Sequence, residues 1–270
     1  MAKSVETTLL VDADVIAYQH AAKAQKTYDW GDGQVSIDVD ELPEVVDGAR
    51  TALKKLSKKF DANIVLCFSD PDVNFRKAIL PSYKGNRKAE KPVLLKELRA
   101  ELSKHYKTYM RATLEGDDVI GILATWPKMP GRKIAVSIDK DLQQIPGELY
   151  NPGHDTLVKI TKEQGFRYHM QQTLTGDAVD GYKGCEGCGP VMAQRTLQGW
   201  SSHAQVWERV IDTYHACNPC PEEWDLPGFD WTGVVEDEAI RQARVAKILQ
   251  AENYNFTTKE PILWLPPSCL

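Results

Sequence analysis

The sequence lacks any uninterrupted apolar run long enough to cross a membrane, which takes about eighteen residues or more. It also lacks internal repeats and low-complexity tracts, and its amino terminus reaches Asp12 too early for a secretory signal peptide. With 42% hydrophobic, 26% charged and 9% aromatic residues, the composition is typical of a folded globular protein. We therefore expect no membrane partner, a cytoplasmic location and reduced cysteines.

Nor does the chain carry an excess of positive charge, since its formal net charge is −5. Net charge constrains solubility and association more than function, so the distribution of charge is more informative. Between Arg76 and Arg111 there are eleven Lys or Arg residues against three Glu, and eleven minus three leaves eight positive charges. This segment predicts contacts with nucleic-acid phosphates, although a basic run is also typical of a solvated helix face.

Three short apolar runs have the β-branched, nearly continuous character of parallel strands covered on both faces: residues 8–11, 64–68 and 133–138. Apolar residues also recur at helical spacing in residues 45–56, 94–102 and 119–124. Strands that alternate with helices predict an α/β fold, with a mostly parallel central sheet flanked by helices, over residues 1–165. From residue 166 to residue 270 the strand signal fades, and we expect a helical region.

Each of the three predicted strands ends at a carboxylate. Asp12 follows the first strand, Asp70 the second, and Asp139 with Asp141 the third. Because ligand sites in open α/β sheets lie at the carboxyl ends of the strands, we expect these acids to converge on one crevice. Carboxylates that lie close together cannot all stay ionised without a cation, and oxygen ligands favour magnesium or manganese. The pattern therefore predicts a metal site.

Two further acidic groups fit the same crevice. Glu115 and Asp118 are three residues apart, with Asp117 between them, and Asp177 and Asp180 have the same spacing. Each pair can share one face of a helical turn, but each pair taken alone can equally be a helix cap. Capping does not explain acids at three strand ends, so the whole set favours a metal site.

Seven short motifs occur in order between residues 8 and 197. They are Leu10-Val11-Asp12, Phe68-Ser69-Asp70, Tyr83-Lys84-Gly85-Asn86-Arg87, Glu115-Gly116-Asp117-Asp118, Asp139-Lys140-Asp141, Gly176-Asp177-Ala178-Val179-Asp180 and Gly184-Cys185-Glu186-Gly187-Cys188-Gly189-Pro190. In order and separation this set resembles the 5′ nuclease superfamily of flap endonucleases, and within it the 5′ to 3′ exonucleases of T7-like phages. The resemblance implies a PIN-like nuclease core followed by a DNA-binding region of the helix-hairpin-helix type.

The resemblance also implies a phosphodiesterase with two magnesium ions, for which manganese can substitute. One ion is then surrounded by Asp12, Asp70, Glu115 and Asp117, and the other by Asp139, Asp141, Asp177 and Asp180, with Asp118 between the two groups. Two ions about 4 Å apart activate the attacking water and stabilise the leaving oxygen, so no protein nucleophile is needed.

The basic segment at about 76–111 resembles the helical arch that covers the active site in this family. The resemblance implies catalytic roles for Lys84 and Arg87, because a cation aimed at the scissile phosphate stabilises charge that develops during cleavage. DNA contacts are expected from Arg76, Lys77, Tyr83 and Lys88.

A glycine-rich stretch that ends at Pro190 predicts a tight turn followed by a helix with proline at its first position. Backbone N–H groups at such a helix start attract phosphates without reading sequence, although a plain glycine-rich connection has the same pattern. The resemblance implies that Gly184, Gly187 and Gly189 belong to a helix-hairpin-helix element at about 176–200, which holds duplex DNA and a potassium ion.

Two cysteine pairs, Cys185 with Cys188 and Cys217 with Cys220, have a pattern that can indicate a structural zinc site. The gap between the pairs is twenty-eight residues, longer than the usual fifteen to twenty or so. In the resembling family the positions of Cys185 and Cys188 hold apolar side chains, and free cysteine packs as a small hydrophobe. Core packing is therefore preferred over zinc.

These observations together predict a metal-dependent 5′ to 3′ exodeoxyribonuclease. The resemblance implies additional flap endonuclease and RNase H-like activity on RNA:DNA hybrids, a role in DNA replication, primer removal and recombination, and partners among replication proteins. One alternative is a PIN-type ribonuclease, which shares the acids at the strand ends but lacks the hairpin and the basic segment. Another is a zinc-stabilised nucleic-acid-binding protein without catalytic activity, which would show no cleavage with magnesium.

Overall fold

Six strands form the central sheet, in the order β5-β4-β1-β6-β7-β8. The computed structural model describes residues 6–87, 89–199, 202–221 and 230–267. The strands of the sheet are β1 (Thr7–Asp12), β4 (Ala62–Phe68), β5 (Lys107–Met110), β6 (Arg132–Val136), β7 (Gly147–Asn151) and β8 (Thr156–Ile160). All neighbours are parallel except β7 and β8, which form an antiparallel pair. The three predicted strands are confirmed as β1, β4 and β6.

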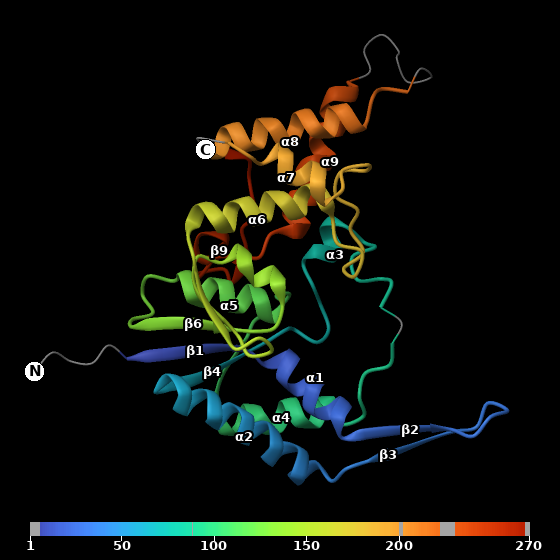
Figure 1. Cartoon of the computed structure of the whole chain (residues 1–270), viewed down its shortest axis with the longest axis vertical. Helices are drawn as coiled ribbons and strands as arrows, with labels where there is room; N and C mark the ends of the chain where they lie inside the picture. Colours follow the sequence, from blue (N-terminus) through green and yellow to red (C-terminus); the bar gives the residue numbers. More distant parts are fainter. Residues whose placement is uncertain (1–5, 88, 200–201, 222–229, 268–270) are drawn as a thin grey trace, which may run out of the picture.

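Helices cover both faces of the sheet, and strand β1 shows why (Figure 1). Leu9 and Val11 point to one face and Leu10 to the other, as alternation along a strand requires, and all three are fully buried. The first face packs against α1 (Ala13–Lys23), α2 (Leu42–Phe60) and α4 (Leu95–His105). The second packs against α5 (Gly116–Thr125) and the chain from Ile248 to Tyr254.

The second half of the described chain builds a separate hydrophobic cluster from four helices, drawn at the top of Figure 1. These helices are α6 (Lys162–Thr175), α7 (Pro190–Thr196), α8 (His203–Cys217) and α9 (Trp231–Ala246). Helix α7 begins with proline at its first turn, as predicted. After α9 the chain returns to the sheet through η3 (Ala251–Asn253), β9 (Tyr254–Asn255) and β10 (Glu260–Pro261), so the helical region is connected to the α/β core at both of its ends.

The basic segment differs from the expected helical arch. It consists of α3 (Arg76–Ile79), an irregular stretch over the described part of residues 80–94, then α4 and β5. Pro81 and Pro92 interrupt helical hydrogen bonding, and the fully buried Leu98 and Leu102 pack α4 onto the core. A pair of helices joined by an irregular stretch therefore replaces the predicted arch.

Two further features complete the fold. Strands β2 (Gln25–Asp29) and β3 (Val35–Val39) form an antiparallel hairpin that projects from the core between α1 and α2 (Figure 1). A 3-10 helix, η1 (Lys140–Gln144), follows β6, with Asp139 as its N-cap and Asp141 in its first turn. Among the described residues, no helix has the length and apolarity needed to span a bilayer.

Candidate active site

The ends of β1 and β6 are joined by a serine that the sequence reasoning missed. Ser137 donates its hydroxyl to Asp12 Oδ2 at 2.8 Å, and Ser137 Oγ accepts the N–H of Asp139 at 3.0 Å. Asp12 also accepts the N–H of Val15 and so caps the N-terminus of α1. Burial, with the nearby carboxylates of Asp14 and Asp139, raises the pKa of Asp12 to about 6 despite these hydrogen bonds. The carboxyl end of β1 is therefore buried and rich in negative charge.

Asp141 is surrounded by other acids. Burial is the main cause that raises its pKa to about 7, and repulsion from Asp139, Asp177 and Asp180 adds to it. Its Oδ1 atom is buried and has no hydrogen-bond partner within the described chain. A buried carboxylate oxygen without a donor is costly, and a bound cation would remove that cost. Asp177 lies beside Lys140, with 3.6 Å between Oδ2 and Nζ.

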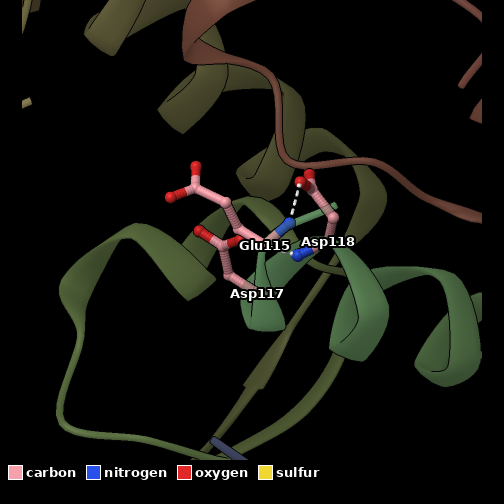
Figure 2. A group of neighbouring side chains, drawn as sticks. All are labelled: Glu115, Asp117 and Asp118. Carbon is pink, nitrogen blue, oxygen red and sulfur yellow. Dashed lines mark hydrogen bonds between the residues drawn. The ribbon is translucent and has the colours of Figure 1, made fainter. Parts of the chain in front are cut away.

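A second group of acids lies at the start of α5. Glu115, Asp117 and Asp118 offer carboxylate oxygens within 4.8 Å of one another, and in the described parts of the chain no other set of three potential metal ligands does so. Figure 2 shows Glu115 and Asp117 directed to one side of the helix start and Asp118 to the other. Burial, with Asp118 and Glu115 next to it, raises the pKa of Asp117 well above its usual range.

Asp118 does not fit the expected role of a metal ligand, despite its place in this group. It is fully buried, and both of its oxygens accept hydrogen bonds from the guanidinium of Arg76, at 2.7 and 2.8 Å. The N–H groups of Leu249 and Glu115 donate to the same carboxylate. With its oxygens occupied in this way, Asp118 is assigned to an ion pair with Arg76.

The predicted phosphate contact of Arg76 is therefore wrong. The side chain is 2% exposed, and beyond Asp118 and Glu115 it donates to the carbonyls of Val245 and Lys247, at 2.9 and 2.6 Å. The N–H groups of this guanidinium donate to partners within the protein, so they are not available to a DNA phosphate.

Tyr83 and Lys84 connect the two groups of acids. The hydroxyl of Tyr83 lies 2.8 Å from Glu115 Oε2 and 3.0 Å from Asp180 Oδ2, so this buried phenol orients acids and does not contact DNA as predicted. Lys84 pairs with Glu115 and lies 3.5 Å from Asp180 Oδ2. Burial acts to raise the pKa of Glu115, but Arg76 and Lys84 lower it to about 2.

The remaining basic residues lie nearer to solvent. Arg87, whose side chain is 53% exposed, donates to Asp180 Oδ1 at 2.7 Å. Lys77 is exposed on α3, so its DNA contact stays a prediction. Lys88 lies outside the described residues.

Asp70 stands at the expected strand end but is engaged differently from the other acids. Its two oxygens accept the backbone N–H groups of Asp72, Val73 and Thr113, and these bonds lower its pKa. Asp14, absent from the predicted set, accepts the N–H of Ser69 at 2.7 Å and lies 3.4 Å from Arg99. The sequence offered one sign that Asp14 belongs to the site, because this acid lies in the first turn of the helix that follows β1.

The three glycines of the hairpin have different surroundings. The N–H of Gly184 donates to Gln242 Oε1 at 3.0 Å, and at its φ of 66° an added Cβ would collide with the backbone of Leu174 and Gly176. Gly184 is thus buried for packing, and the prediction that it contacts DNA is wrong. Gly187 and Gly189 are exposed before α7, where their DNA contact stays a prediction.

The cysteines do not form a four-sulfur site in the part of the chain that the structure describes. Cys185 and Cys188 are buried in the hydrophobic cluster of the helical region, where Cys217 packs beside them. Burial raises the pKa of the Cys185 thiol, which favours the neutral form that packs as a hydrophobe. Cys220 is exposed.

The arrangement suits a divalent cation. Carboxylates from the ends of β1 and β6, from the start of α5 and from the α6–α7 hairpin gather at one end of the sheet, where burial first, and neighbouring carboxylates second, raise the pKa values of Asp12, Asp117 and Asp141. The buried, unpartnered Oδ1 of Asp141 and the oxygen-only donor set fit a hard ion such as magnesium or manganese. Lys84 and Arg87 stand at the same edge as candidate phosphate-binding cations.

The fold and the group of acids together identify the class of protein. A family model described as "5'-3' exonuclease, N-terminal resolvase-like domain" matches residues 7–172, and the chain belongs to this family of nucleases. It is an enzyme of the 5′ to 3′ exonuclease type.

Relatives from two phages match almost the whole chain. The exodeoxyribonuclease of Enterobacteria phage T3 is 30% identical over 287 aligned residues, covering 96% of this chain and 93% of the relative. The exonuclease of Escherichia phage T7 is also 30% identical, over 281 residues, with the same coverage.

Solved structures show the same fold. The D15 protein of phage T5, co-crystallised with metal ions, superposes with a TM-score of 0.63 at 14% identity, over 90% of each chain. A complex of the T5 D15 flap endonuclease with DNA and metal ions superposes with a TM-score of 0.55 at 13% identity, over 89% of this chain and 99% of that one. The predicted α/β fold with a mostly parallel sheet is confirmed.

Proposed function

We propose that this chain is a magnesium-dependent 5′ to 3′ exodeoxyribonuclease and flap endonuclease that works with two metal ions. The observation that carries the proposal is the gathering of mutually repelling carboxylates around Asp141, whose Oδ1 is buried without a hydrogen-bond donor in the described chain. Acids held together at this cost indicate a function that needs them, and phosphodiester hydrolysis with divalent cations is one.

The acids divide into two candidate ligand sets. Asp12, Asp70, Glu115 and Asp117 would hold one ion, although Asp70 would first have to exchange a backbone hydrogen bond for the metal. Asp139, Asp141, Asp177 and Asp180 would hold the other. When bound, the ions would supply a deprotonated water as nucleophile and neutralise charge on the leaving oxygen.

Lys84 has the position of a residue that stabilises the transition state. Its ammonium group lies between Glu115 and Asp180, one from each group of acids. Burial opposes its charge, but Glu115, Asp117 and Asp180 raise the pKa of Lys84, so the side chain stays charged. A charged donor held at the junction of the two ligand sets can meet the scissile phosphate without leaving its place. Arg87, held to Asp180, would grip the same strand.

DNA is the proposed substrate. The structurally similar T5 protein was crystallised with DNA, and the exposed Lys77, Arg87, Gly187 and Gly189 offer charge and backbone N–H groups to phosphates. Cleavage of the RNA strand of hybrids, roles in replication, primer removal and recombination, contacts with replication proteins and a potassium ion at the hairpin are extensions of this proposal.

End-labelled substrates test it. Blunt duplex, 5′-flap, 3′-flap and RNA:DNA hybrid duplexes, and a single-stranded RNA, are incubated with the protein in magnesium or in chelator. We expect nucleotides to be released from the 5′ end and the 5′ flap to be removed, only with magnesium. Release from the 3′ end, cleavage in chelator, or cleavage confined to single-stranded RNA would contradict the proposal, and the last result would favour a PIN-type ribonuclease.

A further inference from the structure

The chain at the end of α9 contacts the elements that carry both groups of acids. We call residues 245–249 the strap, and each of its five residues is buried, with at most 6% of its surface exposed. The odd-numbered residues of the strap bond to one set of side chains, and the even-numbered residues bond to another. The strap therefore joins the two halves of the acidic site.

The odd-numbered residues of the strap bond to an ion pair beside the first group of acids. The guanidinium of Arg76 donates to the carbonyls of Val245 and Lys247, at 2.9 and 2.6 Å. The N–H of Leu249 donates at 3.0 Å to Asp118, which lies in the first turn of α5 and is paired with Arg76. One side of the strap is thus fixed to the helix start that carries the first group of acids.

The even-numbered residues bond to Gln144, the last residue of η1. Its Nε2 atom donates to the carbonyl of Ala246 at 2.7 Å, and its Oε1 atom accepts the N–H of Ile248 at 3.1 Å. The same Nε2 atom donates to Gln172 Oε1 of α6 at 2.5 Å. A glutamine amide has two N–H donors, so both donors and the carbonyl oxygen of this buried side chain are engaged. The other side of the strap is thus fixed to η1.

Gln144 shares its helix with a member of the second group of acids. Asp141 lies three residues earlier in η1, and a 3-10 helix has three residues per turn, so the two side chains lie on the same side of the helix. The Oδ1 atom of Asp141 has no hydrogen-bond partner in the described chain. The direction of this oxygen therefore depends on the helix that carries it, and Gln144 fixes that helix.

Two glycines allow close packing along the same path. A Cβ atom on Gly165 of α6 would lie 2.4 Å from the carbonyl oxygen of Gln144, and a Cβ atom on Gly121 of α5 would lie 2.2 Å from the carbonyl oxygen of Leu249. Both distances are too short for real contacts, so α6 packs directly on η1, and α5 packs directly on the strap. Close-packed interiors transmit small displacements, so a shift of η1 would not be absorbed by empty space.

We infer that Gln144 is a positioning residue, which sets the distance between the two groups of acids through the strap and so sets the spacing of the two metal ions. Gln144 is not itself a ligand, since it acts through Asp141. Enzymes of this kind need their ions about 4 Å apart, and residues that orient metal ligands commonly change metal affinity by about ten- to a hundredfold. This inference rests on the proposed function, because it assumes that both groups of acids hold ions.

Manganese reports both the number and the spacing of the ions. Binding of Mn²⁺ to the DNA-free protein is followed by the electron paramagnetic resonance signal of the free ion, and the bound ions are measured in frozen solution. Two Mn²⁺ ions about 4 Å apart couple magnetically. We expect the wild type to bind two ions with a coupled spectrum. Gln144→Met, which keeps the length of the side chain and removes its amide, should weaken binding of one ion about ten- to a hundredfold and abolish the coupling.

Two controls separate position from stability. Gln143→Met changes the exposed neighbour of Gln144 on the same helix and should bind both ions as the wild type does. Leu53→Ala removes a fully buried side chain of α2, on the other face of the sheet. It should lower the urea midpoint of unfolding without changing Mn²⁺ affinity or coupling. If Leu53→Ala abolished the coupling as Gln144→Met does, the effect would be one of stability, and the inference would be overturned.

Gln172→Met provides the test if Gln144→Met does not fold, because it removes one bond to the same amide and leaves the strap bonds in place. It should weaken the same ion by a smaller factor. Unchanged Mn²⁺ affinity and coupling in the folded variant would overturn the inference while the proposed function stands. A wild-type protein that binds no coupled pair of ions would instead overturn the proposed two-ion function, and this inference with it.

Discussion

Arg76 grips Asp118 through both carboxylate oxygens, at 2.7 and 2.8 Å, and neither side chain is more than 2% exposed. The same guanidinium donates to the carbonyls of Val245, in the last turn of α9, and Lys247, at its C-cap, while Leu249 donates its N–H to Asp118. This pair therefore fastens the segment that leaves the helical region onto α3 and α5, directly behind Glu115. The geometry of the acidic site depends on a contact between distant parts of the chain.

Arg76→Ala should destabilise the protein by about 3–5 kcal/mol, because it leaves the carboxylate of Asp118 buried without its partner. Urea unfolding monitored by circular dichroism measures the loss. The control is Lys77→Ala, its exposed neighbour, which should leave stability unchanged. If Arg76→Ala kept wild-type stability and only lowered the salt dependence of DNA binding, Arg76 would be a phosphate contact after all.

Lys84→Ala should reduce the single-turnover rate of cleavage by about a hundredfold at saturating enzyme, because the lost cation faces charge that grows in the transition state. Affinity for DNA should fall only modestly, and the slope of log affinity against log salt concentration should decrease in magnitude by roughly one. Rapid-quench kinetics and anisotropy separate the two effects. Strongly weakened binding with a normal rate at saturation would make Lys84 a phosphate grip alone.

His169 should contribute a pH-dependent part of the stability. Burial, reinforced by Lys247, lowers the pKa of His169 to about 3, so the folded protein keeps this ring neutral while the unfolded chain protonates near pH 6.5. Stability is therefore lost as pH falls below about 6.5, by about 2 kcal/mol at pH 5. His169→Gln should flatten this part of the pH profile of the unfolding free energy. Identical slopes for both proteins between pH 7 and pH 5 would refute the assignment.

The purified protein should contain less than one equivalent of zinc per chain, as measured by elemental analysis without added metal. Cys185 and Cys188 pack in the hydrophobic cluster of the helical region, where burial disfavours the thiolate that zinc needs. Stoichiometric zinc, with unfolding of the helical region on its removal, would show that these cysteines are ligands.

Local pattern was enough to predict the parts of the site that follow strands. Asp12 and Asp139 lie where apolar runs end, and the parallel sheet brings those ends together. The role of Arg76 could not be predicted in this way, since its partner Asp118 is 42 residues away and its carbonyl partners are 169 and 171 residues away. A basic run shows charge but not which member is buried.

The irregular stretch before α4 has a similar explanation. The apolar stripe that includes Leu98 and Leu102 predicted a helix correctly, but the sequence does not show that this stripe packs on the core beside α1 and α2. Once α4 is held there, the residues before it must run along the edge of the site.

The central claim is that acids gathered at one end of the sheet hold the metal ions that cut DNA. Asp139→Asn combined with Asp141→Asn tests it most directly, because both changes remove charged ligands with little change of shape. Single-turnover cleavage of a 5′-flap duplex is measured across a magnesium titration, with DNA affinity measured in parallel. The matched control is Asp32→Asn with Asp38→Asn, two exposed acids on the β2–β3 hairpin. The account predicts no detectable cleavage by the site variant at any magnesium concentration, near-normal DNA binding, and full activity of the control; substantial cleavage by the site variant in saturating magnesium would contradict it.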